Sequence, residues 1–350
     1  MAGGPPPLRV ECAATRPALW DVFVVAQTDG SVFHTAAWLE AVRAAFGHEI
    51  LYLTARRGPR CVGVLPLACV RSLLGGTMLV SVPYAIYGGV LACDAEAPGA
   101  LLHEARLLAD RCGAGSIELR SPHAAFEGLL PIDRYVTFRR ELPEAAGEVL
   151  GWLPRKARAA ARNAARKHGL SVRFGSGQLP VAWRLYSRSM WRLASLNYPY
   201  RFFEELVARM PDTHLVSVVY RGSTPVAGLL SFLYRETVLP YFVGGDAEAR
   251  RAGAHNFIYQ TLAERSVELG CRVFDFGRSR VDNTGCCDFK RFQGFEPTPL
   301  EYQCDVRPGG RAAALTPSNP KFALARRVWP RLPYPLAACL GAWVSRHVPG

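Results

Sequence analysis

Apolar residues along the chain alternate between helical and strand-like spacing, and the same order of segments occurs twice. Each copy begins with a helix whose apolar residues recur at helical spacing. Two strand-like segments joined by a short turn follow, then a second helix that ends at a glycine, then a further strand. The segments are 34–42, 50–55, 61–70, 101–112 and 116–121 in the first copy, and 200–207, 214–220, 226–233, 255–269 and 273–279 in the second. Five segments in one order indicate an internal duplication.

Two local alignments support the duplication. The segment 63–67 aligns with 228–232 at an offset of 165, and the Gly-Gly pair at 88 aligns with that at 244 at an offset of 156. The short Gly/Pro turns make the paired strands antiparallel. The sequence therefore predicts an α+β fold with two tandem domains, each a mixed, mostly antiparallel sheet flanked by helices. This order of elements resembles the GNAT (acyl-CoA N-acyltransferase) fold.

The duplication also sets the expected domain boundaries. We expect an N-terminal GNAT-like domain over 8–148 and a C-terminal GNAT-like domain over 149–305. A tail over 306–350 is rich in proline, arginine and alanine. No glycine-rich dinucleotide fingerprint and no phosphate-binding Walker A loop is present, so a doubly wound nucleotide-binding fold is excluded.

The tail ends in a short apolar segment, 334–344, which predicts a helix. It is too short to span a bilayer, and no transmembrane helix is expected elsewhere. Two readings remain open: a helix in peripheral contact with the membrane interface, and a helix docked on the protein core. The flanking arginines are Arg326, Arg327, Arg331 and Arg346. Since no apolar signal segment is found at the N-terminus, we expect a cytoplasmic protein, with the inner face of the membrane as a second location.

The charge of the chain favours anionic partners. Its 42 basic and 29 acidic residues give a formal net charge of +13. Nearly all the basic residues are arginines, whose planar fork binds phosphate and carboxylate with two hydrogen bonds. The ten cysteines show no paired metal-ligand spacing, so no metal site is predicted. The adjacent Cys286 and Cys287 are interpreted either as a reactive pair or as small residues in a loop.

A basic stretch separates the two copies. Residues 149–203 contain no Asp or Glu but eleven Lys or Arg. The alanine-rich segment 153–168 within it predicts a helix that ends at Gly169. The arginines at 155, 158, 162 and 166 fall on one stripe of that helix. The stripe is either a solvated surface or a binding site for tRNA, a sugar-nucleotide pyrophosphate or an acyl-carrier phosphate.

Motifs for covalent catalysis are absent. The chain has no Gly-x-Ser-x-Gly elbow and no His-Glu-x-x-His sequence. This favours direct attack by an amine on an activated acyl donor, with proximity and oxyanion stabilisation supplied by the protein. Two segments are candidates for binding the donor or catalysing the transfer. Arg250 and Gly253 open a helix and could bind phosphate, or they form an ordinary helix start.

The second candidate is the densest polar cluster, Asp275, Arg278 and Lys290, at the end of a strand. Asp275 is expected to orient Arg278 or to act as a base, and the pair could equally be a structural ion pair. Lys290 is expected to stabilise an oxyanion or to position the acceptor. We expect Arg158 and Arg162 to bind phosphates, and Tyr198 and Tyr241 to line the substrate site.

Four motifs resemble those of the FemAB-like acyltransferases, and more narrowly the subfamily associated with exosortase/PEP-CTERM exopolysaccharide systems. They are Tyr186-Ser-Arg-Ser-Met190, Tyr200-x-Phe-Phe203, Phe274-Asp-Phe-Gly-Arg-Ser279 and Phe289-Lys290 with Gly294-Phe295. The resemblance implies tandem GNAT-like domains, transfer of an amino acid from aminoacyl-tRNA to a peptidoglycan-precursor peptide, and a catalytic role for Lys290. The long paired-helix arm of some members is missing, which leaves acyl-CoA open as the donor.

These observations together predict an acyltransferase. It would move an aminoacyl or acyl group onto an amine of a cell-envelope precursor, of peptidoglycan type or linked to an exopolysaccharide. One alternative is an acetyl-CoA-dependent N-acetyltransferase that acts on an amino sugar. Another is a non-catalytic basic module that binds tRNA or an exopolysaccharide assembly.

Overall fold

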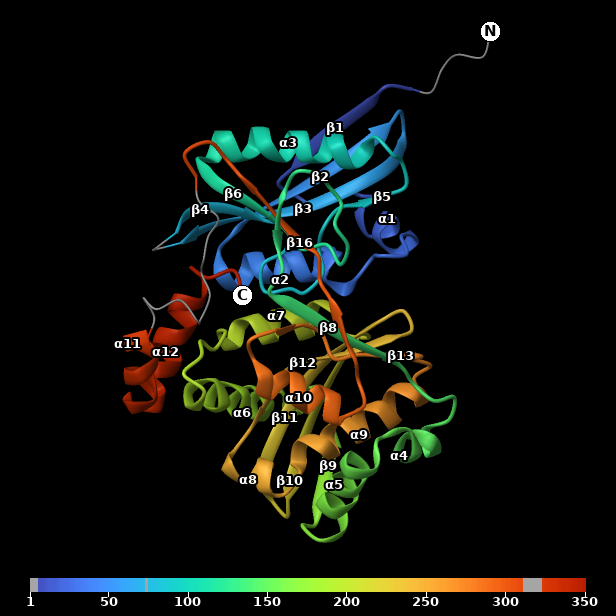
Figure 1. Ribbon diagram of the computed structural model, residues 1–350, viewed down its shortest axis with the longest axis vertical. Helices are drawn as coiled ribbons and strands as arrows, with labels where there is room; N and C mark the ends of the chain where they lie inside the picture. Colours follow the sequence, from blue (N-terminus) through green and yellow to red (C-terminus); the bar gives the residue numbers. More distant parts are fainter. Residues whose placement is uncertain (1–5, 73–74, 311–322) are drawn as a thin grey trace. The chain divides into compact units, whose positions relative to one another are not determined.

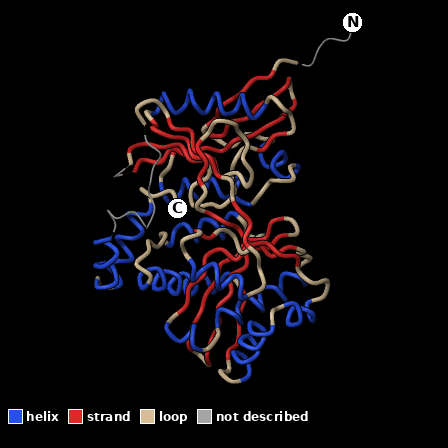
Figure 2. The backbone as a smooth tube through the Cα atoms, in the orientation of Figure 1, coloured by secondary structure: helices blue, strands red, loops and turns tan. Residues whose placement is uncertain are grey.

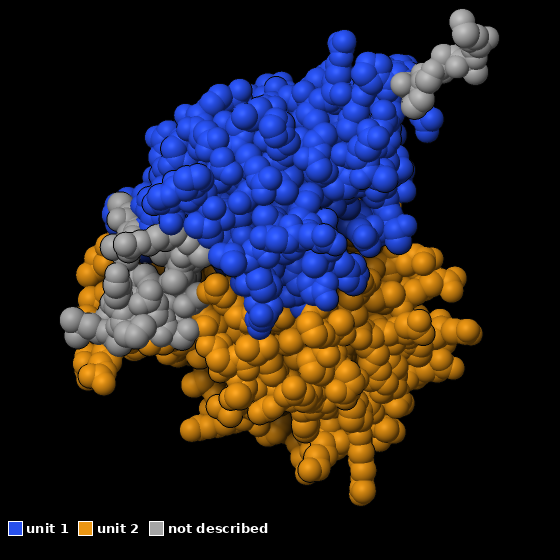
Figure 3. All heavy atoms as spheres, turned by 45° about the horizontal axis from the view of Figure 1, so that its top comes forward, with its two compact units in different colours: residues 1–133, 300–319, 343–350 blue, residues 134–299, 320–342 orange. Residues whose placement is uncertain are grey.

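The computed structural model describes residues 6–72, 75–310 and 323–350. The chain divides into two compact units, shown in different colours in Figure 3. Unit 1 comprises 1–133, 300–319 and 343–350, and unit 2 comprises 134–299 and 320–342. Each unit contains its own eight-stranded sheet. The predicted α+β fold with two mixed, mostly antiparallel sheets flanked by helices is therefore confirmed (Figures 1 and 2).

The sheet of unit 1 has the strand order β1-β2-β3-β4-β6-β16-β7, with β5 paired to β3. Its strands are antiparallel except at the β4–β6 pair. The strands are β1 (Leu8–Ala13), β2 (Glu49–Arg57), β3 (Arg60–Ser72), β4 (Gly76–Val80), β5 (Leu91–Ala92), β6 (Ala114–Leu119), β7 (Leu130–Ile132) and β16 (Tyr302–Val306).

The helices of unit 1 are α1 (Trp20–Ala26), α2 (Ala36–Phe46) and α3 (Ala97–Cys112). The Thr35 hydroxyl accepts a hydrogen bond from the first turn of α2, which ends at Gly47 in the left-handed region. Glycine at position 113 ends α3 in the same way, as the sequence predicts. The apolar face of α3 packs on the sheet through Leu101 and Ala105.

The sheet of unit 2 has the order β14-β8-β13-β12-β11-β10-β9, with β15 paired to β8. Only β12 and β13 run parallel. The strands are β8 (Tyr135–Glu141), β9 (Leu170–Phe174), β10 (His214–Arg221), β11 (Thr224–Tyr234), β12 (Thr237–Gly245), β13 (Val273–Asp275), β14 (Ser279–Arg280) and β15 (Pro297–Pro299).

Alternate residues of β11 and β12 face two different helical layers. Leu229 and Val238 lie in a core with the helix α9 (Ala254–Glu268). On the other face, α6 (Leu179–Arg192) packs directly on the strands, and α7 (Tyr200–Arg209) packs against α6. The close approach of α6 depends on glycine, because a Cβ on Gly228 would lie 2.6 Å from Ala182 Cα.

Six further helices belong wholly or partly to the described residues of unit 2. They are α4 (Val149–Trp152), α5 (Arg155–Arg166), α8 (Ala247–Arg251), α10 (Thr284–Phe292) and α11 (Ala323–Val328), and α12 (Tyr334–Ser345) begins in this unit. The predicted basic helix is α5, with its buried side formed by Ala157, Ala161 and Ala164. The predicted apolar tail segment is α12. Among the described residues, no helix is long and apolar enough to cross a membrane.

The unit boundaries differ from those expected from the repeat. Residues 134–148 were expected in the first domain, but β8 pairs with β13, β14 and β15 of unit 2. Residues 300–305 were expected in the second domain, but β16 pairs with β6 and β7 of unit 1. Each sheet is thus completed by a strand from beyond the expected domain boundary. That strand lies far in sequence from the strands it pairs with, and it covers an edge that would otherwise be unpaired.

Candidate active site

The strand β13 ends in a loop that is held by buried polar contacts. Asp275 is 1% exposed, and its Oδ1 accepts a 2.8 Å hydrogen bond from the Gly277 amide. Gly277 has a φ of +65°, in the left-handed region that favours glycine. The Thr137 hydroxyl donates to the same Oδ1 at 3.5 Å, and Arg139 Nε lies 3.4 Å from Oδ2. The carboxylate of Asp275 therefore fixes the turn that follows β13.

Lys290 of α10 closes the same loop from the other side. Its Nζ donates hydrogen bonds of 2.8, 2.8 and 3.2 Å to the carbonyl oxygens of Phe276, Gly277 and Arg278. The side chain is 6% exposed, and burial lowers the pKa of its ammonium group. In this conformation the three N–H groups of the ammonium match three backbone acceptors. Lys290 thus holds the loop that presents Arg278.

The guanidinium of Arg278 lies over the Tyr135 ring, with Cζ 4.6 Å from the ring centroid. The structure therefore brings together the three residues of the predicted polar cluster, Asp275, Arg278 and Lys290. Asp275 binds the turn and Arg139, while Arg278 stacks on Tyr135. Tyr135, Thr137 and Arg139 all lie on β8, which the sequence analysis assigned to the other domain. These three residues alternate along one strand and so share one of its faces. This pattern was the signal in the sequence that β8 contributes to the site.

A second group of polar side chains gathers on β12, α6 and the segment before α7. Tyr186, Tyr198 and Tyr241 surround Phe242, with ring-centroid distances of 5.7, 5.8 and 4.7 Å to it. Burial, with the neighbouring tyrosines, raises the pKa of Tyr186 well above its usual value. Tyr198 and Tyr241 are half-buried. The two predicted substrate-binding tyrosines thus belong to one aromatic cluster.

The polar cluster with Arg278 and the tyrosine cluster lie where the parallel strands β12 and β13 stop pairing. β12 and β13 pair only at Thr237–Val273 and Val238–Phe274. The β12 register against β11 then shifts between Leu230 and Ser231, which leaves Tyr241 as the extra residue of a bulge. A bulge takes a backbone N–H out of the ladder and redirects its side chain. Beyond the last paired residues, Tyr241 lies farther along β12, and Arg278 lies in the loop after β13.

The predicted phosphate-binding glycine serves a packing role. Gly253 precedes α9 with a φ of +69°, and a Cβ there would lie 3.1 Å from the Ala160 carbonyl oxygen of α5. Glycine is therefore required by backbone conformation and by the contact with α5. Arg250, three residues earlier, is exposed. The half-buried His255 lies beside Gly245, and burial lowers the pKa of its imidazole.

The basic stripe lies on the outer side of α5. Arg155, Arg162 and Arg166 are exposed, and Arg158 is half-buried with Nη2 donating to the Leu153 carbonyl at 3.2 Å. Within the described part of the chain, no carboxylate lies within ion-pair distance of these four arginines. The helix packs through its alanines on α9. The stripe therefore presents uncompensated positive charge at the surface.

Comparison with known proteins identifies the fold. Residues 154–291 match the family model of the acetyltransferase (GNAT) domain. The structure of FemX superposes with a TM-score of 0.66 at 14% identity, covering 85% of this chain and 97% of FemX. The chain has a tandem GNAT fold. No curated protein sequence matches it.

Two further solved structures have the same tandem GNAT fold. A tandem GNAT protein from the clavulanic acid biosynthesis pathway gives a TM-score of 0.57 at 13% identity, covering 88% of this chain and 100% of that one. The L-PGS of Bacillus licheniformis gives 0.55 at 14% identity, covering 95% and 100%. The matched GNAT segment contains the tyrosine cluster, Arg278 and Lys290, but β8 lies outside it.

The vicinal cysteines lie in the first turn of α10 and not in a loop. The Asn283 side chain accepts a hydrogen bond from the Cys286 amide at 3.3 Å. Cys286 Sγ lies 3.2 Å from Ser279 Oγ, and Cys287 Sγ lies 3.4 Å from the Arg280 carbonyl oxygen. Both are free thiols. Over the described ranges, no group of three or more His, Cys, Asp or Glu side chains is placed to hold a metal ion.

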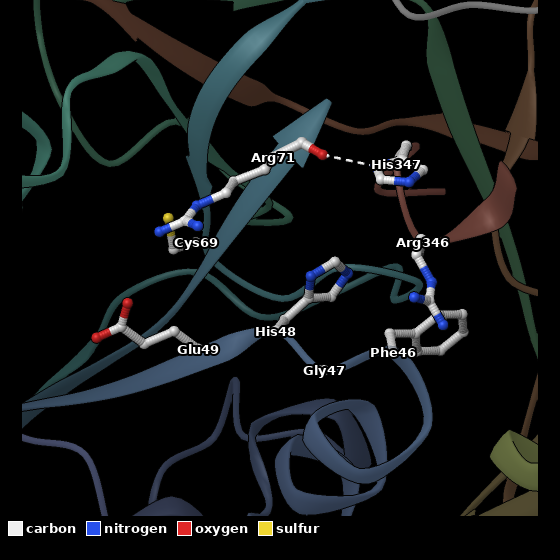
Figure 4. Close-up of a pocket in the computed structure, with 8 residues that line it drawn as sticks. All are labelled: Phe46, Gly47, His48, Glu49, Cys69, Arg71, Arg346 and His347. Atoms are coloured by element: carbon white, nitrogen blue, oxygen red, sulfur yellow. Dashed lines mark hydrogen bonds between the residues drawn. The ribbon is translucent and has the colours of Figure 1, made fainter. Parts of the chain in front are cut away.

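Unit 1 contains a cavity of about 260 Å³, shown in Figure 4. None of the catalytic, substrate-binding or phosphate-binding residues predicted from the sequence lines it. His48 at its base bonds to the Tyr84 hydroxyl at 2.8 Å, and burial with the charges of His347 and Arg346 lowers its pKa to about 4. The lining residues are Phe46, Gly47, His48, Glu49, Cys69, Arg71, Arg346 and His347.

Proposed function

We propose that this protein transfers an aminoacyl or acyl group onto an amine of a cell-envelope precursor, of peptidoglycan type or linked to an exopolysaccharide. The GNAT domain and the similarity of the fold to FemX and L-PGS support an acyltransferase of envelope components. The motifs shared with the exosortase/PEP-CTERM-associated subfamily favour an exopolysaccharide-linked acceptor. The proposal depends most on one observation: Arg278 and Tyr241 follow the two parallel strands beyond their divergence.

The acceptor is proposed to bind at the tyrosine cluster. Tyr198 and Tyr241 are half-buried and carry hydroxyl groups on an aromatic surface. Such a surface can contact the apolar side of a sugar or peptide and accept a hydrogen bond from its amine. Arg278 stacks on Tyr135 in a fixed orientation, so its fork is prepared for a carboxylate or phosphate of the substrate.

The reaction is proposed to proceed by direct attack. The neutral amine attacks the acyl carbonyl, a tetrahedral oxyanion forms, and the bond to the ester or thioester leaving group breaks. The amine loses one proton, and the leaving group gains one. We assign Lys290 and Asp275 positioning roles, because both bind the backbone of the loop that presents Arg278.

The donor is proposed to be an aminoacyl-tRNA or an acyl-CoA, both of which carry phosphates. Arg162 is exposed on α5, and Arg158 at half-burial keeps part of its guanidinium for a ligand. Arg250 and Gly253 lie where α5 packs on the start of α9. These residues are the candidates within unit 2 for binding donor phosphates.

An acetyl-CoA-dependent N-acetyltransferase that acts on an amino sugar is the second candidate. The match of residues 154–291 to the acetyltransferase (GNAT) domain favours it. This function needs a coenzyme A pyrophosphate site near Arg250 and Gly253. It differs from the first candidate in the donor, and therefore in which ligand stabilises the folded protein.

The test is transfer followed by mass spectrometry. The purified protein is incubated with acetyl-CoA or aminoacyl-tRNA and with UDP-linked muropeptide or amino-sugar acceptors. The proposal predicts that one donor–acceptor pair gains the acyl mass. Tyr241→Phe and Arg278→Gln should lower the rate at least about tenfold. Arg265→Gln, on a surface ion pair of the same unit, is the matched control. Salt-sensitive anion binding without transfer from any donor would instead identify a non-catalytic basic module.

A further inference from the structure

The helix α12 exposes one continuous apolar face. Leu336, Cys339, Leu340 and Trp343 recur at helical spacing and therefore share one side of the helix. Leu336 is 49% exposed, Leu340 38% and Trp343 51%, and Cys339 is also exposed. The Trp343 ring lies beside that of His347, at a centroid distance of 5.4 Å. We call these four residues the outer face of α12.

The opposite side of α12 is closely packed, which fixes the direction of the outer face. Ala337 is 1% exposed, and Gly341 leaves no room for a Cβ against the Asn197 side chain. Asn197 Nδ2 donates to the Ala338 carbonyl oxygen at 3.1 Å. The Trp191 indole N–H binds the Leu332 carbonyl just before the helix. Small residues thus allow the helix to pack closely. These contacts block a rotation of α12 about its own axis that would bury its large apolar residues.

The charged side chains of the segment that contains α12 are all basic. Residues 306–350 contain no Asp or Glu. Arg326, Arg327 and Arg331 precede the helix and are exposed, and the exposed Arg346 follows it directly. An exposed apolar helix face beside exposed arginines can bind the interface of an anionic bilayer, through burial of apolar area and attraction to lipid phosphates.

We propose that α12 docks its outer face on the surface of an anionic phospholipid bilayer. The helix would lie in the plane of the interface, because its twelve residues extend about 18 Å at 1.5 Å per residue and cannot span the hydrocarbon core. Leu336 and Leu340 would enter the acyl boundary. The flanking guanidinium groups would bind lipid phosphates, with Trp343 at the level of the headgroups.

A bilayer explains these observations better than a second copy of the chain. A symmetric contact through the outer face would bring two sets of like-charged arginines together, with no acidic residue in the segment 306–350 to compensate them. Anionic headgroups supply the missing negative charge. The exposed apolar residues then gain an apolar environment without a protein partner.

The experiment is co-sedimentation of the full chain with phosphatidylcholine vesicles, with and without phosphatidylglycerol. We expect binding that requires phosphatidylglycerol and weakens with salt. The variant Leu336→Ser/Leu340→Ser/Trp343→Ser should lower the partition coefficient at least about tenfold. Arg326→Gln/Arg327→Gln/Arg331→Gln should lower it and reduce its salt dependence. Leu193→Ser removes a leucine of unit 2 that is more exposed than Leu336 or Leu340, and it should change nothing.

A second measurement places Trp343 directly. Brominated phospholipids should quench part of the tryptophan fluorescence in the native chain, and this part should disappear in Trp343→Phe. Thermal unfolding checks that the variants, altered only at exposed side chains, remain folded. The proposal is overturned if the triple serine variant binds vesicles as the native chain does. It is also overturned if light scattering shows that the outer face forms a dimer without lipid.

Discussion

The Nζ atom of Lys290 lies 2.8 Å from the carbonyl oxygen of Gly277, the residue with left-handed backbone in the loop after β13. The ammonium also binds the two neighbouring carbonyls. A buried ammonium is retained because three backbone acceptors replace its water shell. The lysine and the glycine therefore determine together how the loop presents Arg278.

Replacement of Lys290 by methionine should lower stability and turnover together. The substitution keeps most of the apolar stem but leaves three loop carbonyls without their donor, which should reduce the free energy of unfolding by about 3 kcal/mol. Urea unfolding and acyl transfer measure the two effects. If Lys290 acted only on an oxyanion, turnover would fall while the urea midpoint stayed unchanged.

Gly277→Ala provides the matched test of loop geometry. The ammonium of Lys290 is kept, but an alanine at a φ of +65° carries a strain of about 1–2 kcal/mol. We expect reduced turnover with a smaller loss of stability than in Lys290→Met. Gly285→Ala, a glycine of α10 whose added Cβ meets no atom within 4 Å, should retain full activity.

The basic face of α5 should contribute to donor binding and not to folding. Arg155→Gln/Arg162→Gln/Arg166→Gln alters only exposed side chains without carboxylate partners. We expect the Kd for the anionic donor to rise about tenfold at low salt, and its salt dependence to become weaker. Arg201→Gln/Arg209→Gln on α7 alters arginines that pair with Glu205 and is the control for net charge. An unchanged Kd and salt slope would exclude the face from donor binding.

Unit 1 should lose stability as the pH falls from about 6.5 to 4. Burial lowers the pKa of His34 and of His48 to about 4, so the unfolded chain binds more protons than the folded one in this window. Stability is complete at neutral pH, and each imidazole should remove about 3 kcal/mol at pH 4. Urea unfolding at pH 7 and pH 4.5 measures the loss. His48→Gln should reduce the pH dependence, whereas His123→Asn, at an exposed position, should leave it as in the native chain.

Much of the architecture could be predicted from the sequence because its patterns are local. Helical spacing and a terminal glycine defined α5 and α3, and short Gly/Pro turns defined the antiparallel pairs β2–β3 and β10–β11. Asp275, Arg278 and Lys290 were found because they are close in sequence to one strand end. Their meeting in space depends on one helical segment, α10, packed beside that strand end.

The partners from β8 could not be predicted in the same way. Tyr135, Thr137 and Arg139 lie well over a hundred residues before the loop that they contact, and only the sheet pairing of β8 with β13 brings them there. The packing role of Gly253 was also missed, because its neighbour Ala160 belongs to a helix whose position depends on tertiary contacts. In both cases the missing information is long-range packing, which residue spacing does not carry.

The exchange of β8 and β16 has a consequence for synthesis on the ribosome. The sheet of unit 1 keeps an open edge at β6 until residues 302–306 have been translated and have left the exit tunnel. Release of the N-terminal half alone would therefore leave a strand edge exposed to other nascent chains. A gene cut at residue 148 should yield two insoluble fragments, whereas co-expressed fragments should recover solubility by restoring β16 to its place.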